Sequence, residues 1–255
     1  MITSILQYST MDLRFLKTNL EQLSKFSDEI LVVMCTHLFN GEMEDEKLLQ
    51  QTYAICEQHP KAHIHTFEWQ GINQNPGYYH NVSRLLGTQV ASGEWLLFVD
   101  ADEIVSDNFG DWFNKVKHTD NTFWLTCHWY FREPIYQSTS LESAGLLIKK
   151  TKCNWNVEVR SERQQLFGIE GFVNGDHQCI LHNNEPLIDH YSWVRSEDEM
   201  LKKVRNWGHK GDKRWVELVK EEFSRPFNGT DFVHGYQYTK VSNKLKLSNT
   251  DENIL

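Results

Sequence analysis

Two aspartates, Asp100 and Asp102, directly follow an uninterrupted run of apolar residues at 95–99. Such a run predicts a strand that is buried on both faces. In an open α/β sheet the ligand crevice lies beyond the carboxyl ends of the strands, so both carboxylates would face a bound ligand. Residues i and i+2 of an extended chain point the same way, and two carboxylates together can hold Mg²⁺ or Mn²⁺. The spacing therefore predicts a metal site that carries phosphate oxygens. The alternative is an acidic turn that caps the next segment.

The segments before residue 95 predict the sheet that would hold these aspartates. Apolar and alternating runs predict strands over 4–9, 29–34 and 63–69. Apolar residues at helical spacing, with turn residues around them, predict helices over 12–24, 45–57 and 78–92. This β-α-β-α-β order is typical of a doubly wound parallel sheet with right-handed crossovers. The predicted fold class is therefore α/β.

The stretch that leads into the aspartates resembles the nucleotide-binding half of the family 2 type glycosyltransferases. The family pattern runs Arg-Asn-x-Gly, a helix, Ala-x-Gly-Glu/Asp-Trp/Tyr, an apolar strand and a DXD motif. It is matched here by Arg84, Gly87, Ala91, Gly93, Glu94, Trp95, Asp100 and Asp102. Leu85 stands where the family usually has Asn. The resemblance is strongest over residues 78–105. It implies the GT-A fold of the nucleotide-diphospho-sugar transferases, a Rossmann-like, mostly parallel sheet flanked by helices.

The same resemblance implies an activity and its donor contacts. The chain would be a metal-dependent, hexosyltransferase-type glycosyltransferase, with a UDP-sugar as the expected donor and a carbohydrate or glycoconjugate as the acceptor. Arg84 would pair with the pyrophosphate, Asp100 with the ribose or the metal ion, and Asp102 with the metal ion. Thr10 and Thr36 follow the first and second strands and complete the predicted nucleotide site, because the acids that usually end the second strand are absent here. For Arg84 the alternative is a solvated side chain on a helix surface.

A histidine later in the chain is the predicted third metal ligand. His190 ends a late strand and precedes a capping box at 196–199. It resembles the position from which some metal-dependent members of the superfamily complete the coordination of the cation, and His182 is the second choice. The helix that follows is expected over 197–207. Its basic residues could close over a diphosphate as a lid or form a solvated face; they are Lys202, Lys203 and Arg205.

The predicted catalytic domain covers residues 1–195, with a nucleotide-binding half at 1–105, an acceptor half at 106–195, and a helical extension at 196–255. In the acceptor half, an aromatic strand over 123–131 offers rings for stacking on sugars or for the core. A loop is expected from Arg132 and a further strand at 145–148. If the transfer inverts the anomeric centre, a carboxylate must take the proton of the acceptor hydroxyl. The candidates are Glu158, Glu162, Glu170 and Asp176, of which Glu162 is favoured.

Composition excludes several classes of protein. The chain has 255 residues and a net charge of −9, which argues against a general nucleic-acid binder, since such proteins carry a basic footprint. No apolar run reaches the length of a membrane span, and no basic leader precedes the first apolar residues. The five cysteines are scattered without a Cys-x-x-Cys pair, which favours reduced thiols and a cytoplasmic location.

Two hypotheses that assign the chain to other classes of protein stay open. A haloacid-dehalogenase-like phosphatase also places Asp-x-Asp after an apolar strand and would use Asp100 as the nucleophile. That family usually has Thr or Val at the position of Ile104 and places the motif near the start of the domain, whereas three β-α units precede it here. The second is a carbohydrate-binding protein that keeps a transferase fold but has lost catalytic activity. Leu85 and the missing acids after the second strand would then be positions where catalytic features have been lost.

Overall fold

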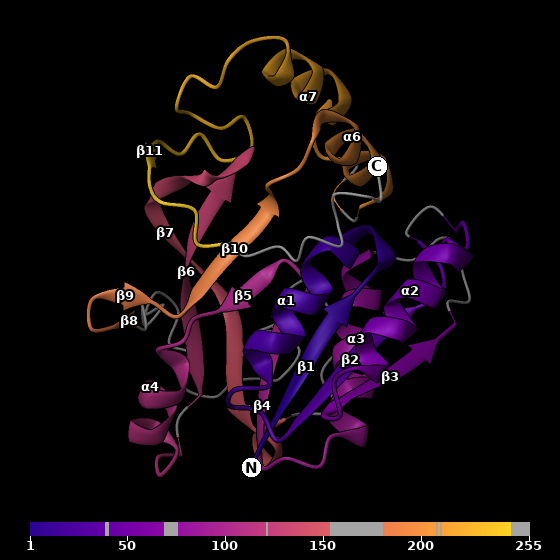
Figure 1. The fold of residues 1–255 in the computed structure, drawn as a ribbon, viewed down its shortest axis with the longest axis vertical. Helices are drawn as coiled ribbons and strands as arrows, with labels where there is room; N and C mark the ends of the chain where they lie inside the picture. The colour runs from indigo at the N-terminus through magenta and orange to yellow at the C-terminus, as the bar shows by residue number, and fades with distance from the viewer. Residues whose placement is uncertain are drawn as a thin grey trace.

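A large sheet forms the centre of the computed structural model, which describes residues 1–38, 41–68, 76–120, 122–153, 181–207, 209 and 211–245. Nine strands of the described chain pair in the order β3-β2-β1-β4-β7-β6-β10-β5, with β11 beside β7 (Figure 1). The first seven elements alternate: β1 (Ile2–Tyr8), α1 (Leu13–Leu23), β2 (Glu29–Cys35), α2 (Glu46–Glu57), β3 (Ala62–Phe67), α3 (Pro76–Val90) and β4 (Trp95–Asp100). The remaining main elements are β5 (Glu103–Val105), α4 (Phe109–Val116), β6 (Phe123–Phe131), β7 (Glu133–Lys149), β10 (Ile188–Trp193), α6 (Glu197–Asn206), α7 (Trp215–Phe223) and β11 (Tyr238–Lys240).

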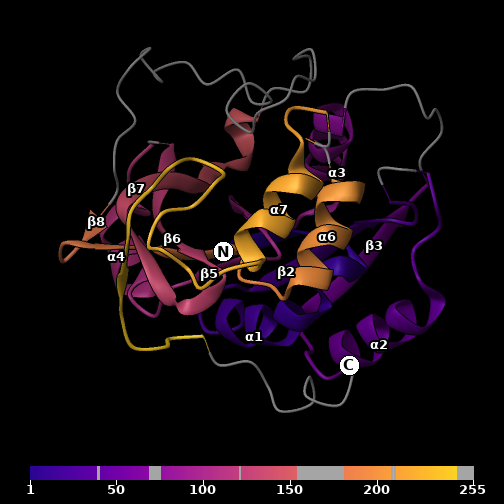
Figure 2. The ribbon, with the colours of Figure 1, turned by 90° about the horizontal axis from the view of Figure 1, so that it is seen from above.

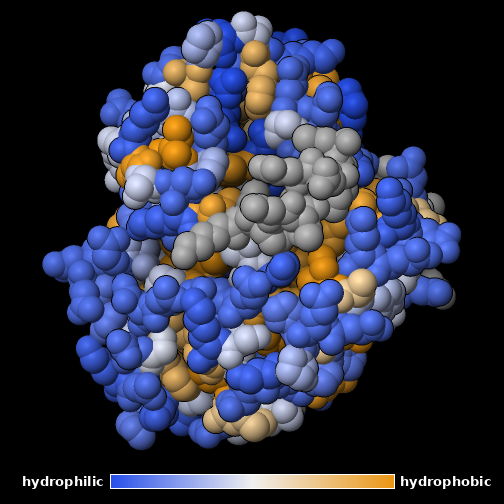
Figure 3. Space-filling view, viewed as in Figure 1, coloured by the Kyte–Doolittle hydropathy of each residue, from blue (hydrophilic) through white to orange (hydrophobic). Residues whose placement is uncertain are grey.

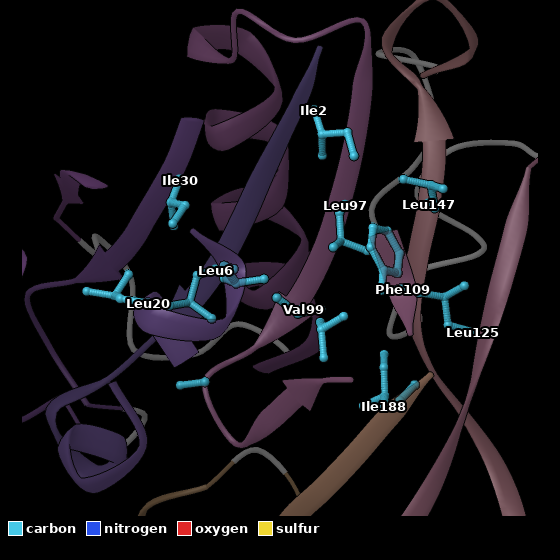
Figure 4. Close-up of a cluster of buried hydrophobic side chains, with 14 of the residues drawn as sticks. Ile2, Leu6, Leu20, Ile30, Leu97, Val99, Phe109, Leu125, Leu147 and Ile188 are labelled. Carbon is cyan, nitrogen blue, oxygen red and sulfur yellow. The ribbon is translucent and has the colours of Figure 1, made fainter. Parts of the chain in front are cut away.

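The strands β3, β2, β1 and β4 are parallel neighbours. Helices cover both of their faces, which explains why β2 and β4 are apolar without alternation. Leu6 of β1 packs in one cluster with Leu20 of α1 and Phe109 of α4 (Figure 4), while Ile5 packs on the other face with Leu85 of α3. The predicted α/β class, a Rossmann-like sheet flanked by helices, is therefore confirmed.

Beyond β4 the sheet becomes mixed. β7 runs antiparallel to both β4 and β6, and β10 is parallel to β6 and antiparallel to β5. The strand predicted at 145–148 is present as the end of β7, but the loop predicted from Arg132 is wrong, because residues 133–149 form one strand. Arg132 alone makes the turn, with a φ of 58°. Register shifts between β6 and β7 break the regular alternation of the strand, so its full length was not visible in the sequence pattern.

The C-terminal helices α6 and α7 pack on the ends of β6 and β10 through a cluster of aromatic side chains. Trp193 of β10 lies against Trp207 and Trp215, with ring centroids 5.3 and 5.9 Å away. Phe131 and Phe232 belong to the same cluster. In Figures 1 and 2 the two helices lie beyond the carboxyl end of β1, over the edge of the sheet where β1 and β4 end. The cluster thus fixes α6 above the aspartates.

The surface seen in Figure 3 is largely hydrophilic, with apolar residues scattered among charged ones. None of the helices in the described part of the chain has the length and hydropathy to cross a membrane.

Candidate functional site

A cavity of about 290 Å³ opens at the carboxyl ends of the parallel strands. Ser9, Cys35 and Asp100 line it from the ends of β1, β2 and β4, and Lys203 lines it from α6. The carboxyl edge is where ligands enter an open α/β sheet, because the loops that leave neighbouring strands diverge there. The cavity therefore lies where the DXD motif predicted a ligand.

Asp102 forms the charged centre of this cavity. Its side chain is 8 % exposed and lies 3.2 Å from Lys203 Nζ, 3.3 Å from His190 Nε2 and 3.7 Å from Arg195 Nη2. Burial alone would raise the pKa of this carboxyl, but Lys203, His190 and Arg195 hold it well below its usual range. Asp102 is therefore a buried carboxylate whose charge is balanced by protein cations.

His190 faces Asp102 from β10. The register places it opposite Glu103 of β5 and beside Trp129 of β6. Burial lowers the pKa of the imidazole, but hydrogen bonds with Asp102 and Cys127 and the nearby Glu103 carboxylate outweigh this and raise the pKa well above its usual range. The His190 imidazole is thus held against the Asp102 carboxylate, 3.3 Å away.

Arg195 and Lys203 are held by several hydrogen bonds each. Arg195 donates to the backbone oxygens of Met11 and Ser192 at 3.0 and 2.9 Å and pairs with Asp12 at the start of α1. Lys203 donates to Ser192 Oγ at 2.7 Å as well as to Asp102. Both cations are therefore positioned before any ligand enters.

The start of α6 explains why Lys203 reaches the cavity. Ser196 and Glu199 form the predicted capping box, in which the Ser196 hydroxyl accepts from the Glu199 amide and the Glu199 carboxylate accepts from the Ser196 amide. Glu199 also pairs with Arg14 of α1 at 2.9 Å. These contacts fix the first turn of α6, and Lys203 lies one turn further along.

Arg84 and Asp100 form a second ion pair beside the first. Arg84 Nη2 donates to Asp100 Oδ1 at 3.1 Å, and Nη1 donates to Asn81 at 3.1 Å. Arg84 is 5 % exposed, so it is not a solvated side chain on a helix surface. The Asp100 side chain keeps 32 % of its surface exposed and lines the cavity. A ligand could therefore form a hydrogen bond with the exposed part of the Asp100 carboxylate. Asp100 would keep its ion pair with Arg84 when it does so.

Glu44 is an acid of the cavity that the sequence did not identify. It is 5 % exposed, and its carboxylate accepts hydrogen bonds from the Ser9 hydroxyl at 2.7 Å and from the Thr10 hydroxyl. Its backbone amide donates to Thr36 O at 3.0 Å, so the loop after β2 returns to the end of the strand. The family pattern places an acid directly at the end of the second strand. Here the acid is Glu44, which lies eight residues after Thr36 in that returning loop. The available sequence signal was Asp45, the N-cap of α2, because it shows that Glu44 is the last loop residue before the helix.

A row of rings leads away from Asp102 through β6 and the segment 234–236. The His190 and Trp129 rings lie 4.3 Å apart, and Trp129 lies 4.8 Å from His234. His234 stacks on Tyr236 at 5.0 Å, and the Tyr236 hydroxyl donates to Glu142 of β7. Glu142 is thus connected to His190 of the cavity by a series of direct contacts between neighbouring side chains.

The predicted site residues fall into four groups. Asp100, Asp102 and His190 line the cavity, and Arg84 adjoins it through Asp100. Thr10 and Thr36 lie just behind the lining of the described cavity: Thr10 binds Glu44, and the Thr36 hydroxyl lies 3.0 Å from His37 Nδ1. His182 belongs to β8 (Leu181–His182), which pairs with β9 (Glu185–Pro186) in a separate two-stranded sheet. Glu162 lies outside the described residues, as do Glu158, Glu170 and Asp176.

The arrangement does not fit the predicted metal ion. Within the described ranges, no group of three or more His, Cys, Asp and Glu side chains could hold one. As a ligand, the His190 imidazole would have to give up its 3.3 Å contact with Asp102. A divalent ion at Asp102 would also have to displace the Lys203 ammonium. The metal-binding role of Asp100, Asp102 and His190 is thus a sequence prediction that this geometry does not support.

Comparison with known proteins gives distant structural similarities. No protein-family model matches the chain, and no curated protein matches it. The crystal structure of S. aureus TarS 1-349 is similar at 13 % identity, over 88 % of this chain and 72 % of that chain, with a TM-score of 0.40. HddC from Yersinia pseudotuberculosis is similar at 6 % identity, over 59 % of this chain and 78 % of that chain, with a TM-score of 0.36. A putative glucose-1-phosphate thymidylyltransferase from Bacillus anthracis is similar at 8 % identity, over 59 % and 72 %, with a TM-score of 0.38. At this distance the activity has to be argued from the site itself.

Proposed function

We propose that the chain is a glycosyltransferase of the GT-A type that transfers a sugar from a nucleoside-diphosphate-sugar donor to an acceptor hydroxyl. The observation that carries the proposal is the cavity at the carboxyl ends of β1, β2 and β4, which combines the carboxylates of the DXD motif with preorganised cations. Carboxylates suit the hydroxyls of a ribose, and cations suit a diphosphate.

The donor would lie across the cavity in a defined direction. The nucleoside would occupy the end near β2, where the Glu44 and Asp100 carboxylates can accept hydrogen bonds from its hydroxyls. The diphosphate would lie near Asp102, where Lys203 and Arg195 supply positive charge. A UDP-sugar is the donor that the family resemblance favours.

In the reaction, the acceptor oxygen forms a bond to the anomeric carbon, and the bond from that carbon to the diphosphate oxygen breaks with its electron pair. The nucleoside diphosphate leaves, and the proton of the acceptor hydroxyl passes to a carboxylate. Inversion at the anomeric carbon follows if this is one displacement. Glu162 is the base predicted from the sequence. Among the described residues, Glu142 is a second candidate, because its contact series with Tyr236 and His234 leads to His190.

The test is thermal unfolding of the chain with UDP, GDP and CDP, each with EDTA and with Mn²⁺. A ligand at 100 times its Kd stabilises a protein by about 2.7 kcal/mol, which corresponds to a rise of about 5–10 °C for a chain of this size. One nucleotide should produce this rise. Asp100→Asn should reduce it, and Asp107→Asn should not, because Asp107 lies in an exposed ion pair with Lys25.

The outcomes separate the three readings of the sequence. Binding followed by release of sugar from the matching nucleotide sugar supports the transferase. Binding of that nucleotide sugar without turnover against a panel of acceptors supports a carbohydrate-binding protein on the same fold. Absence of any nucleotide effect removes the proposal. Trapping of a phosphorylated Asp100 would then establish the phosphatase reading.

A further inference from the structure

The surroundings of Asp102 point to a way of neutralising a diphosphate that differs from the sequence prediction. Three basic side chains, counted among the described residues, contact this one carboxylate: His190 from β10, Arg195 from the link to α6, and Lys203 from α6 itself. In contact with these side chains are the carboxylates of Asp102 and Asp12. The contacts therefore place a guanidinium and an ammonium at the position where a metal ion was predicted.

All three basic side chains also line the cavity. Their geometry suits phosphate oxygens, since a guanidinium donates in a planar fork and an ammonium donates in several directions. Ser192 fixes both Lys203 and Arg195, through its hydroxyl and its backbone oxygen. Phosphate oxygens would therefore meet donors that need little reorganisation, which is the condition for strong electrostatic stabilisation.

We propose that Lys203, Arg195 and His190 bind the diphosphate of the donor in place of a divalent cation. This inference rests on the proposed function. Asp102 occupies these donors before the diphosphate enters and is not a metal ligand. When the donor binds, Lys203 and Arg195 donate to the phosphate oxygens that carry the charge of the leaving diphosphate. α6 thereby becomes part of the donor site.

The first experiment is isothermal titration calorimetry of the native chain with UDP and with inorganic pyrophosphate, in EDTA and in Mn²⁺. If protein cations hold the diphosphate, UDP binds in EDTA with an affinity within about threefold of that in Mn²⁺. Binding of UDP only in Mn²⁺ would overturn the inference and leave the proposed function standing. Absence of binding in both buffers, and with GDP and CDP, would overturn both.

Variants then identify the groups. Lys203→Met keeps the aliphatic stem and removes the charge, so UDP in EDTA should bind about tenfold more weakly or worse. Lys203→Arg should recover part of this loss. Lys220→Met is the matched control, because Lys220 is an exposed lysine of the neighbouring helix α7. Unchanged affinity in a folded Lys203→Met variant, with the fold checked by circular dichroism, would overturn the inference.

Asp102→Asn gives opposite results under the two ideas. If Asp102 were a metal ligand, the variant would lose binding in Mn²⁺. If Asp102 only holds the cations, the variant frees them from a competing carboxylate, and pyrophosphate in EDTA should bind at least as tightly as to the native chain. Pyrophosphate should also raise the unfolding midpoint of this variant by more than it raises that of the native chain, because the anion takes over the partners of the lost carboxylate. A loss of pyrophosphate binding in EDTA would contradict the inference.

Discussion

At the scale of single residues, Asp102 and His190 stabilise one another while both are charged. The pKa of Asp102 is lowered in the folded chain, so its contribution is present above about pH 4 and is lost as the pH falls through the lowered value. The pKa of His190 is raised, so its contribution is present below about pH 6.5 and is lost as the pH rises through the raised value. The pair therefore contributes most between about pH 4 and pH 6.5.

This pair predicts a decline in stability on the alkaline side. Above about pH 6.5 the unfolding free energy should fall by up to about 1.4 kcal/mol per pH unit until the native His190 is deprotonated. Urea unfolding at a series of pH values measures this slope. His190 also faces Glu103, Cys127 and His234, whose charges act on the same proton. The difference between the native chain and His190→Gln isolates the contribution of the imidazole, and an identical slope in the two proteins would contradict the assignment.

At the scale of elements, two glycines of the family-like pattern have a packing role. A Cβ atom on Gly87 of α3 would lie 2.6 Å from Ile5 Cγ2 and 3.2 Å from Val33 Cγ2, so the helix could not rest on β1 and β2 at its present distance. A Cβ atom on Gly93 would lie 2.6 Å from the backbone nitrogen of Thr3. Both glycines therefore let the chain approach β1 closely just before β4 begins.

Gly87→Ala should lower the unfolding free energy by about 1–3 kcal/mol. The new methyl group would collide with Ile5 and Val33, which cannot move aside unless the core between α3 and the sheet repacks. Gly110→Ala is the matched control within α4. Its new methyl group would meet only Phe26 Cβ, at 4.0 Å. That variant should be unchanged or slightly more stable, because alanine favours helix over glycine. Chemical denaturation of both variants measures the difference, and equal stabilities would show that α3 can shift.

The capping box of α6 gives a second prediction at this scale. Ser196→Ala removes the side-chain acceptor of the Glu199 amide and should cost about 1 kcal/mol of stability. Ser224→Ala is the control, because that hydroxyl donates to Glu221 O at the far end of α7 and caps no amide. Its effect should stay within about 0.5 kcal/mol. Urea denaturation distinguishes the two, and equal losses would mean that the cap does not stabilise the start of α6.

At the scale of the whole molecule, the sequence predicted what local patterns determine. The parallel half followed from unbroken apolar runs in β2 and β4, and the capping box of α6 followed from the spacing of Ser196 and Glu199. His190 was predicted beside Asp102 from the family resemblance. Arg195 and Lys203 could not be assigned to Asp102 from local patterns, and Lys203 lies 101 residues from it in the chain. Lys203 was visible only as one basic residue among several on a helix. Tertiary packing selects it, since the face of α6 that carries it is turned toward β10.

That packing predicts that the aromatic cluster controls ligand binding from a distance. Trp215 is 5 % exposed and packs between Trp193 and Trp207, so Trp215→Ala should cost about 3–5 kcal/mol and loosen α6 over the cavity. Trp112 of α4 is 6 % exposed and packs on Phe123, so Trp112→Ala should cost a similar amount.

The two tryptophan variants should nevertheless differ in affinity. Loss of Trp215 removes the support that holds Lys203 and Arg195 above Asp102, so folded protein should bind pyrophosphate several-fold more weakly. Loss of Trp112 removes core volume beneath the other end of the sheet and should leave the affinity unchanged. Calorimetric titration at a temperature where both variants remain folded makes the comparison. Equal affinities would mean that α6 keeps Lys203 in place over the cavity without the packing of Trp215, and that the aromatic cluster does not control ligand binding.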